Sequence, residues 1–296
     1  MKYNIEILRL IAVVLITFTH TRHCLDDGVF RYVIEDIPKF GTLTLSIISG
    51  YLYWKTAKDK TTIFGKKVKT LLIPYLIANG IVILASSVSH YGFGFNFLNR
   101  LSFDYTLLTE GFLSLNSPPI NPPTYFIRDI FIIFTLIEFV RSRNLYMLLI
   151  IIPYAVFGRL LLRYDILILF LTGVSIAYSE DFIKKYYRYI ISAGAVISVL
   201  FVCFSDIHTY KYAVAIFVFM LFFNLNVRFF NVGGFSYLLH LYHSPVIVTT
   251  FPLLALFITN PYVSVTVQIL TALAACFVIY LLTSKFNKLK ILSGGR

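Results

Sequence analysis

Residues 6–23 read Glu6-Ile-Leu-Arg9-Leu-Ile-Ala-Val-Val-Leu-Ile-Thr-Phe-Thr-His20-Thr-Arg-His23, and this stretch indicates what kind of fold the chain adopts. It is apolar enough to enter a membrane, yet it carries a carboxylate, a guanidinium and two imidazoles. A charged group in hydrocarbon costs roughly 2.5–3.5 kcal/mol even on insertion scales, so such groups usually face a protein interior or a wet cavity. The stretch therefore predicts a membrane span with a polar face.

Arg9 and His20 are eleven residues apart, which is three turns of α-helix plus about 20°. We therefore expect both side chains on one helix face, about 16 Å apart along the axis. In the simpler interpretation, Arg9 extends to the inner interface and His20 is a hydrogen-bonded structural histidine. With Glu6 on the same short span, a functional interpretation is favoured.

The composition is that of a membrane protein. The 296 residues are 58% hydrophobic and only 14% charged, whereas soluble domains have about 25% charged residues. Since no long polar block interrupts the chain, we expect one membrane-embedded domain over residues 1–296 and no cleaved signal peptide. The isolated Cys24, Cys203 and Cys276 lack metal-ligand spacing, so neither a disulfide framework nor a metal site is expected.

The apolar stretches predict an all-α, polytopic protein of about ten transmembrane helices. They lie near residues 5–23, 41–55, 71–90, 123–141, 145–163, 164–179, 186–205, 210–227, 235–259 and 262–283. With the N-terminus inside, seventeen Lys and Arg fall on inner segments and seven on outer ones. By the positive-inside rule both termini are cytoplasmic, and the net charge of +12 reflects topology rather than nucleic-acid binding.

Two loops are distinctive. The inner loop between Trp54 and Thr70 holds six lysines, which topology and contact with anionic lipid would partly explain. The outer loop, residues 91–124, is long and carries several aromatic side chains before a Pro-rich end. Such a loop is typical of a lid or re-entrant element. Its aromatic rings could stack on sugars or form an interfacial belt.

Five elements, taken in order, resemble the acyltransferase 3 family of bacterial membrane O-acyltransferases. Arg9 and His20, with ten residues between them, match the family's signature, and Glu6 stands where an acidic residue is usual. The others are Ser46-Ile-Ile-Ser49-Gly50-Tyr51-Leu52, Lys66-Lys67-Val-Lys69-Thr-Leu-Leu-Ile-Pro74-Tyr75, Tyr125-Phe126-Ile127-Arg128-Asp129 and Ser236-Tyr237-Leu-Leu-His240-Leu-Tyr-His243-Ser-Pro245-Val.

The chain departs from the family's pattern at several positions. Lysines replace the basic cluster's usual arginines, which keeps the charge but loses bidentate phosphate recognition. Tyr125 replaces a tryptophan and His240 a tyrosine, His23 is additional, and the outer loop differs. We expect no appended esterase-like domain.

The resemblance implies transfer of an acyl group, most simply acetyl, from cytoplasmic acyl-CoA to a sugar hydroxyl of a lipid-linked or cell-surface polysaccharide. It also implies location in the bacterial plasma membrane, with acyl-CoA as donor substrate and no bound cofactor. In this interpretation four cationic groups hold the CoA phosphates: Arg9, Lys66, Lys67 and Lys69.

His20 would then be the general base, or a transient acyl carrier. Asp129 is a candidate to orient it, although Arg128 is an alternative partner of that carboxylate. Glu6 is expected to pair with Arg9 or a nearby lysine, and His243 to line the acyl-CoA route or to be structural. The remaining supporting residues carried by the resemblance are Ser49, Gly50, Tyr51, Tyr125 and Tyr237; Ser49 and Gly50 are also expected to allow close helix packing.

Two other functions compete with the enzyme. Intramembrane His, Asp and Glu side chains also form proton relays, so a transporter of a polysaccharide precursor or acyl substrate is the alternative. A structural subunit of a polysaccharide export system is the third. The basic loop beside Arg9 favours the enzyme, because a transporter needs no nucleotide-binding clamp.

Overall fold

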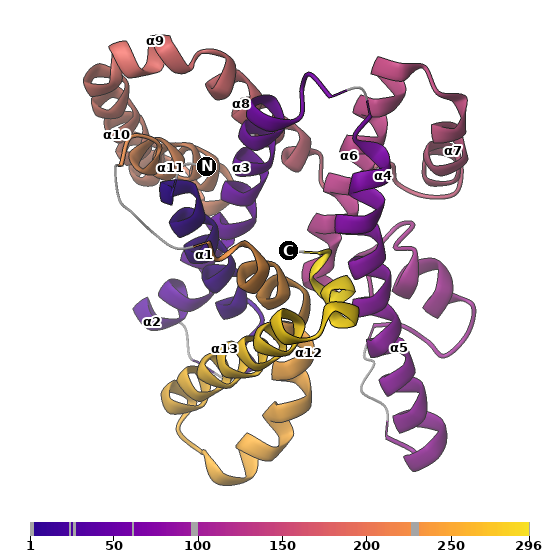
Figure 1. The fold of residues 1–296 in the computed structure, drawn as a ribbon. Coiled ribbons are helices and arrows are strands. Elements are labelled where there is room, and N and C mark those ends of the chain that lie inside the picture. Colours follow the sequence, from indigo (N-terminus) through magenta and orange to yellow (C-terminus); the bar gives the residue numbers. More distant parts are fainter. Residues whose placement is uncertain are drawn as a thin grey trace.

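A computed structural model describes residues 3–23, 25, 28–60, 62–95, 100–225 and 231–295, and all regular elements in these ranges are helical (Figure 1). The longer helices are α1 (Tyr3–Phe18), α3 (Phe40–Thr56), α5 (Ile73–Phe93), α6 (Tyr125–Ser142), α7 (Leu148–Phe157), α8 (Tyr164–Tyr178), α10 (Tyr187–Phe204), α11 (Ile207–Phe223), α12 (Gly233–Phe257) and α13 (Pro261–Lys285). The shorter elements are α2 (Val29–Arg31), η1 (Tyr32–Asp36), η2 (Ile37–Lys39), α4 (Phe64–Lys67), η3 (Val68–Leu72), η4 (Leu107–Phe112), η5 (Pro122–Thr124), η6 (Leu145–Met147), α9 (Glu180–Lys185) and η7 (Asn287–Ser293).

Each of the ten predicted apolar stretches overlaps one of the longer helices. Within the described ranges, four helical segments are long and apolar enough to cross a membrane: Phe64–Phe93, Tyr187–Phe204, Gly233–Phe257 and Pro261–Lys285. The all-helical membrane fold is therefore confirmed, while ten spans and the orientation of the termini stay predictions. The division of 145–179 into two helices is correct, because residues 158–163 separate α7 from α8.

The first helix is shorter than the predicted span. It ends at Phe18, and His20 lies in the turn that follows. The hydroxyls of Thr19 and Thr21 donate to the backbone carbonyls of Ile16 and Phe18, at 2.7 and 2.8 Å, and so satisfy acceptors that the end of a helix leaves open. Arg9 therefore lies on the helix as predicted. His20 does not lie on that helix, because the turn after it positions this side chain.

The third helix is the packing centre of one side of the molecule, since it contacts α1, α8 and α11. Two glycines allow its approach to α8. A Cβ at Gly50 would lie 1.8 Å from the carbonyl oxygen of Phe170, and one at Gly173 would lie 2.1 Å from that of Ile47. The predicted role of Gly50 in close helix packing is confirmed.

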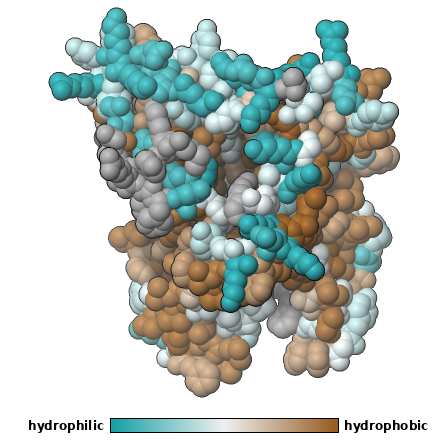
Figure 2. Space-filling view, viewed as in Figure 1, coloured by the Kyte–Doolittle hydropathy of each residue, from teal (hydrophilic) through white to brown (hydrophobic). Residues whose placement is uncertain are grey.

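Basic and polar links gather at one edge of the molecule. In Figure 1 the segment that follows α3, helix α9 and the link from α6 to η6 lie along the upper edge of the view. Figure 2 shows hydrophilic side chains along that edge and in the middle of this face, and mostly apolar side chains toward the lower edge of the view. An ion-pair cluster joins the end of α3 to α9, because Lys55 and Lys184 both contact the Glu180 carboxylate, at 2.6 and 2.7 Å.

Candidate functional site

A cavity of about 260 Å³, cavity A, lies among α1, α3, α6, α12 and the η3 turn. Arg9 lines it and pairs with Glu6 at 2.9 Å, so the predicted Glu6–Arg9 pair is present. The Arg9 side chain is 20% exposed and that of Glu6 is 3% exposed. The guanidinium is thus held by a buried carboxylate while it borders the cavity.

Only one lysine of the predicted phosphate clamp borders cavity A. Lys67 lines it, and its Nζ lies 3.6 Å from the centroid of the Phe134 ring. Lys66 and Lys69 are exposed and are not among the residues that line the cavity. Ser49 and Tyr237 also line cavity A, together with His240. The structure therefore places Arg9, Lys67, Ser49 and Tyr237 around one space.

His20 borders two further cavities of different character. Cavity B, about 480 Å³, is largely apolar and is lined by residues of α5, the outer loop and α12. Arg22 and Arg100 also line it. Cavity C, about 400 Å³, is more polar and is lined by groups that include His23, Glu35 and Arg163. His20 is thus the residue common to both cavities.

Two histidines of α12 lie between cavity A and His20. His240 lines cavity A, and its ring centroid lies 6.5 Å from that of His243. The ring of His243 in turn lies 5.2 Å from that of His20. His243 is fully buried: its Nδ1 contacts the Leu239 carbonyl at 2.6 Å, and its Nε2 has no partner among the described residues. Among the described residues, none lines both cavity A and either cavity at His20. The rings of His240, His243 and His20, which we call the histidine bridge, lead from cavity A to the other two cavities.

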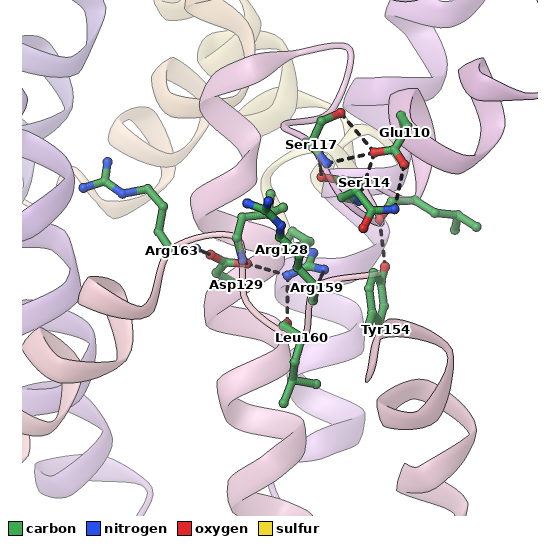
Figure 3. A network of polar contacts seen from close by, with 12 residues as sticks. Glu110, Ser114, Ser117, Arg128, Asp129, Tyr154, Arg159, Leu160 and Arg163 are labelled. Carbon is green, nitrogen blue, oxygen red and sulfur yellow. Dashed lines mark hydrogen bonds and ion pairs between the residues drawn. The ribbon is translucent and has the colours of Figure 1, made fainter. Parts of the chain in front are cut away.

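The contacts of Asp129 are with partners other than His20. Its carboxylate accepts hydrogen bonds from the backbone nitrogens of Leu162 and Arg163, at 3.1 and 3.0 Å, and from Arg128 at 2.6 Å. Figure 3 shows this carboxylate beside Arg128 and the 159–163 link, while the Arg163 side chain points away. Asp129 thus binds the link before α8. Arg128, which was predicted as the alternative partner to His20, forms the ion pair with this carboxylate.

Arg128 completes the same clamp. Its guanidinium donates to the carbonyl oxygens of Leu160, at 2.8 Å, and Arg159, at 2.5 Å, and it lies over the Tyr154 ring at 4.3 Å. Side chains of both Arg128 and Asp129 are almost completely buried. An ion pair in such a place is strongly destabilised when one partner is removed. The pair therefore holds residues 159–163 in place between α7 and α8.

Two predicted supporting tyrosines have structural partners. Tyr51 donates to the Glu180 carboxylate at 3.1 Å and packs against Phe219, away from the three cavities. Tyr125 lines cavity C, and its hydroxyl accepts a hydrogen bond from Arg163 at 3.0 Å.

The outer loop is ordered around one carboxylate. Glu110 accepts hydrogen bonds from the backbone nitrogens of Asn116 and Ser117, at 2.9 and 2.8 Å, and from the Ser117 hydroxyl (Figure 3). Burial alone would raise the pKa of Glu110, but these hydrogen bonds outweigh it and hold that pKa below its ordinary value. Of the loop's aromatic residues, Phe103 stacks on His90 at 4.0 Å and Phe93 is exposed, whereas Phe97 lies outside the described residues.

Three residues at the site, Gln268, His23 and Glu35, have no role in the prediction from the sequence. Gln268 of α13 accepts a hydrogen bond from the Arg22 backbone nitrogen and donates one to the Arg22 carbonyl, both at 2.8 Å. His23 contacts Glu35 at 3.6 Å. A glutamine within an apolar span was a usable signal for Gln268, since a buried amide needs partners. No signal in the sequence links His23 to Glu35.

Helices apolar enough to cross a membrane, with charged and polar side chains lining the cavities among them, define the class of a membrane protein with a polar site. The chain belongs to the acyltransferase 3 family, because that family's profile, described as an acyltransferase domain, matches residues 2–283. The protein is therefore a membrane acyltransferase. No curated protein and no solved structure matches the chain.

Proposed function

We propose that the protein transfers an acyl group, most simply acetyl, from cytoplasmic acyl-CoA to a hydroxyl of a lipid-linked or cell-surface polysaccharide in the bacterial plasma membrane. One observation carries this proposal: the two cations assigned to the donor, Arg9 and Lys67, border a different cavity from His20, and the histidine bridge runs between these cavities. Arg9 and Lys67 line cavity A, and His20 lines cavities B and C. A donor and an acceptor can therefore approach from different directions.

Cavity A suits the donor. Acyl-CoA has a polyanionic nucleotide end, and guanidinium and ammonium groups are the usual partners of phosphate. Arg9 and Lys67 provide these groups at the cavity, and the exposed Lys66 and Lys69 add positive potential outside it. The basic edge of the molecule supports placing this side at the cytoplasm.

The chemistry at His20 is proton transfer. A neutral imidazole accepts the proton of a sugar hydroxyl as the sugar oxygen attacks the thioester carbonyl. The new C–O bond forms, the C–S bond breaks, and the proton passes to the departing CoA sulfur. In the covalent variant His20 carries the acyl group first. Either route requires the thioester to pass His243, so side chains of the bridge must move during turnover.

Cavity B supports a lipid-linked acceptor. Its wall is largely aliphatic, with contributions from Ile81, Val82 and Val248, and Arg22 and Arg100 border it. An alkyl chain ending in phosphate has the matching chemistry. In this proposal the lipid lies in cavity B and brings its sugar to His20.

Mass spectrometry of host glycans, with and without this protein, tests the proposal. Deletion should remove alkali-labile acyl groups from the polysaccharide and leave the polymer at the surface, and wild-type protein but not His20→Ala should restore them. Binding of CoA to purified protein checks the donor half. Loss of the polymer itself from the surface would instead indicate a transporter, and unchanged acylation would contradict the enzyme.

A further inference from the structure

Cavity C differs from the other two in the number of polar side chains around it. Besides His20, it is lined by Thr19, Thr21, His23, Glu35, Lys39, Thr42, Tyr125 and Arg163. Hydroxyls, imidazoles and a carboxylate are groups that recognise sugar hydroxyls, which both donate and accept hydrogen bonds. This cavity opens directly on His20, the proposed base.

The cations at cavity C are already paired with carboxylates. Arg163 forms an ion pair with Asp165, and Lys39 contacts Asp36 at 2.5 Å. These contacts reduce the positive potential available to an anionic ligand. The cavity's own carboxylate, Glu35, is likewise paired, with Arg31 at 3.0 Å, so no described lysine or arginine at this wall is left without a carboxylate partner. The electrostatics therefore disfavour a ligand that carries a carboxylate or phosphate inside cavity C.

Glu35 is held so that one oxygen faces His23. Its Oε2 accepts from Arg31 at 3.0 Å, and its Oε1 lies 3.6 Å from Nε2 of His23. The His23 side chain is 6% exposed, whereas that of Glu35 is 36% exposed. Two bonds from Arg22 to Gln268 fix the backbone between His20 and His23. The His23–Glu35 pair is thus at a set position relative to the proposed base.

We propose that cavity C binds an uncharged sugar ring and that the His23–Glu35 pair determines this specificity. The pair contributes one acceptor and one donor to ring hydroxyls, and the Glu35 carboxylate is an unfavourable neighbour for the carboxylate of acidic sugars such as uronic acids, because the lysine and arginine at the wall are already paired. This inference rests on the proposed function and extends it to the class of acceptor. Glu35 and His23 are specificity-determining residues, and the proton transfer stays with His20.

Saturation-transfer NMR on the purified full-length protein in detergent tests the proposal. The probes are methyl glycosides of glucose, galactose and rhamnose, and the methyl glycosides of glucuronic and galacturonic acid. We expect at least one neutral glycoside to bind and the corresponding uronic acids to bind more weakly. Glu35→Gln should weaken the affinity for the neutral glycoside about tenfold, as loss of a hydrogen bond to a charged group does. It should also reduce the difference in affinity between the neutral and the acidic glycosides.

His23→Gln should weaken the same neutral probe, while Asp181→Asn on the distant α9 removes a comparable carboxylate and should change nothing. Uronic acids that bind wild-type protein as well as neutral glycosides, unchanged binding in Glu35→Gln, or no glycoside binding at all would each overturn the proposal. Binding of CoA, measured in the same samples, separates the two proposals. CoA binding without glycoside binding overturns only the sugar assignment, and glycoside binding without CoA binding overturns only the acyl-CoA donor.

Discussion

At the residue scale, the site consists of a few polar side chains whose partners differ in kind. Arg9 has a charged partner one helical turn away, in Glu6. His20 has a ring neighbour on another helix, in His243, and borders open space on two sides. A paired cation suits ligand binding, whereas an imidazole beside open space suits proton transfer.

His20→Ala should reduce acyl transfer by about 10²–10⁴-fold, the range over which a positioned general base contributes. Because His20 lies in a turn beside cavities, the protein should remain in the membrane at near-normal amounts. The measurement is the transfer rate in isolated membranes, normalised to protein level. His208→Ala removes an exposed histidine and should have no effect. Full activity of the His20 variant would remove that residue from the mechanism.

Arg9→Ala should weaken CoA binding by at least about tenfold, as loss of a charge-assisted contact does. It should also lower the amount of folded protein, because the buried Glu6 carboxylate loses its partner. Adding Glu6→Gln should restore folding but not affinity. Calorimetric titration with CoA measures the affinity, and Lys69→Ala, at an exposed position, should have the smaller effect. A change in acceptor affinity alone would contradict the donor assignment.

At the element scale, links between helices are fixed by side chains from other elements. Asp129 and Arg128 of α6 bind the 159–163 link, and Gln268 of α13 binds the segment that carries His20. Both links leave backbone groups without helical partners, and buried side chains provide them. Polar residues in these apolar helices therefore position loops as well as reacting groups.

Asp129→Asn distinguishes the structural role of this carboxylate, which is to hold the 159–163 link, from its predicted role in orienting His20. The substitution leaves Arg128 buried without its carboxylate, and breaking such a pair costs about 3–5 kcal/mol. We expect a lower thermal unfolding temperature in detergent and less protein in the membrane, with the activity of the remaining folded enzyme largely kept. A stable variant with lost activity would instead support orientation of His20 by Asp129.

At the scale of the whole molecule, one edge carries the basic links and the apolar surface lies beyond it. If both termini are cytoplasmic, the link between α3 and α4 is inside and the link between α10 and α11 is outside. In a chain with Cys24→Ser, Cys203→Ser and Cys276→Ala, we expect an impermeant maleimide to label His208→Cys in intact cells. Asp59→Cys should be labelled only after the membrane is opened, and the reverse pattern would invert the topology.

The membrane class, the helical stretches, the family and the Glu6–Arg9 pair could all be predicted from the sequence. These depend on local patterns, namely runs of apolar residues and charges three residues apart on a helix. The sequence could not show that α1 ends before His20, since threonine hydroxyls compete there with the helix for backbone carbonyls.

Helix packing determines which residues far apart in the sequence become partners. Asp129 binds backbone groups 33 and 34 residues away, and Gln268 reaches Arg22 across 246 positions. It likewise brought His243 against His20 and left Lys66 and Lys69 outside cavity A. Such contacts follow from how helices pack, and packing depends on shape complementarity between surfaces that no local pattern in the chain records.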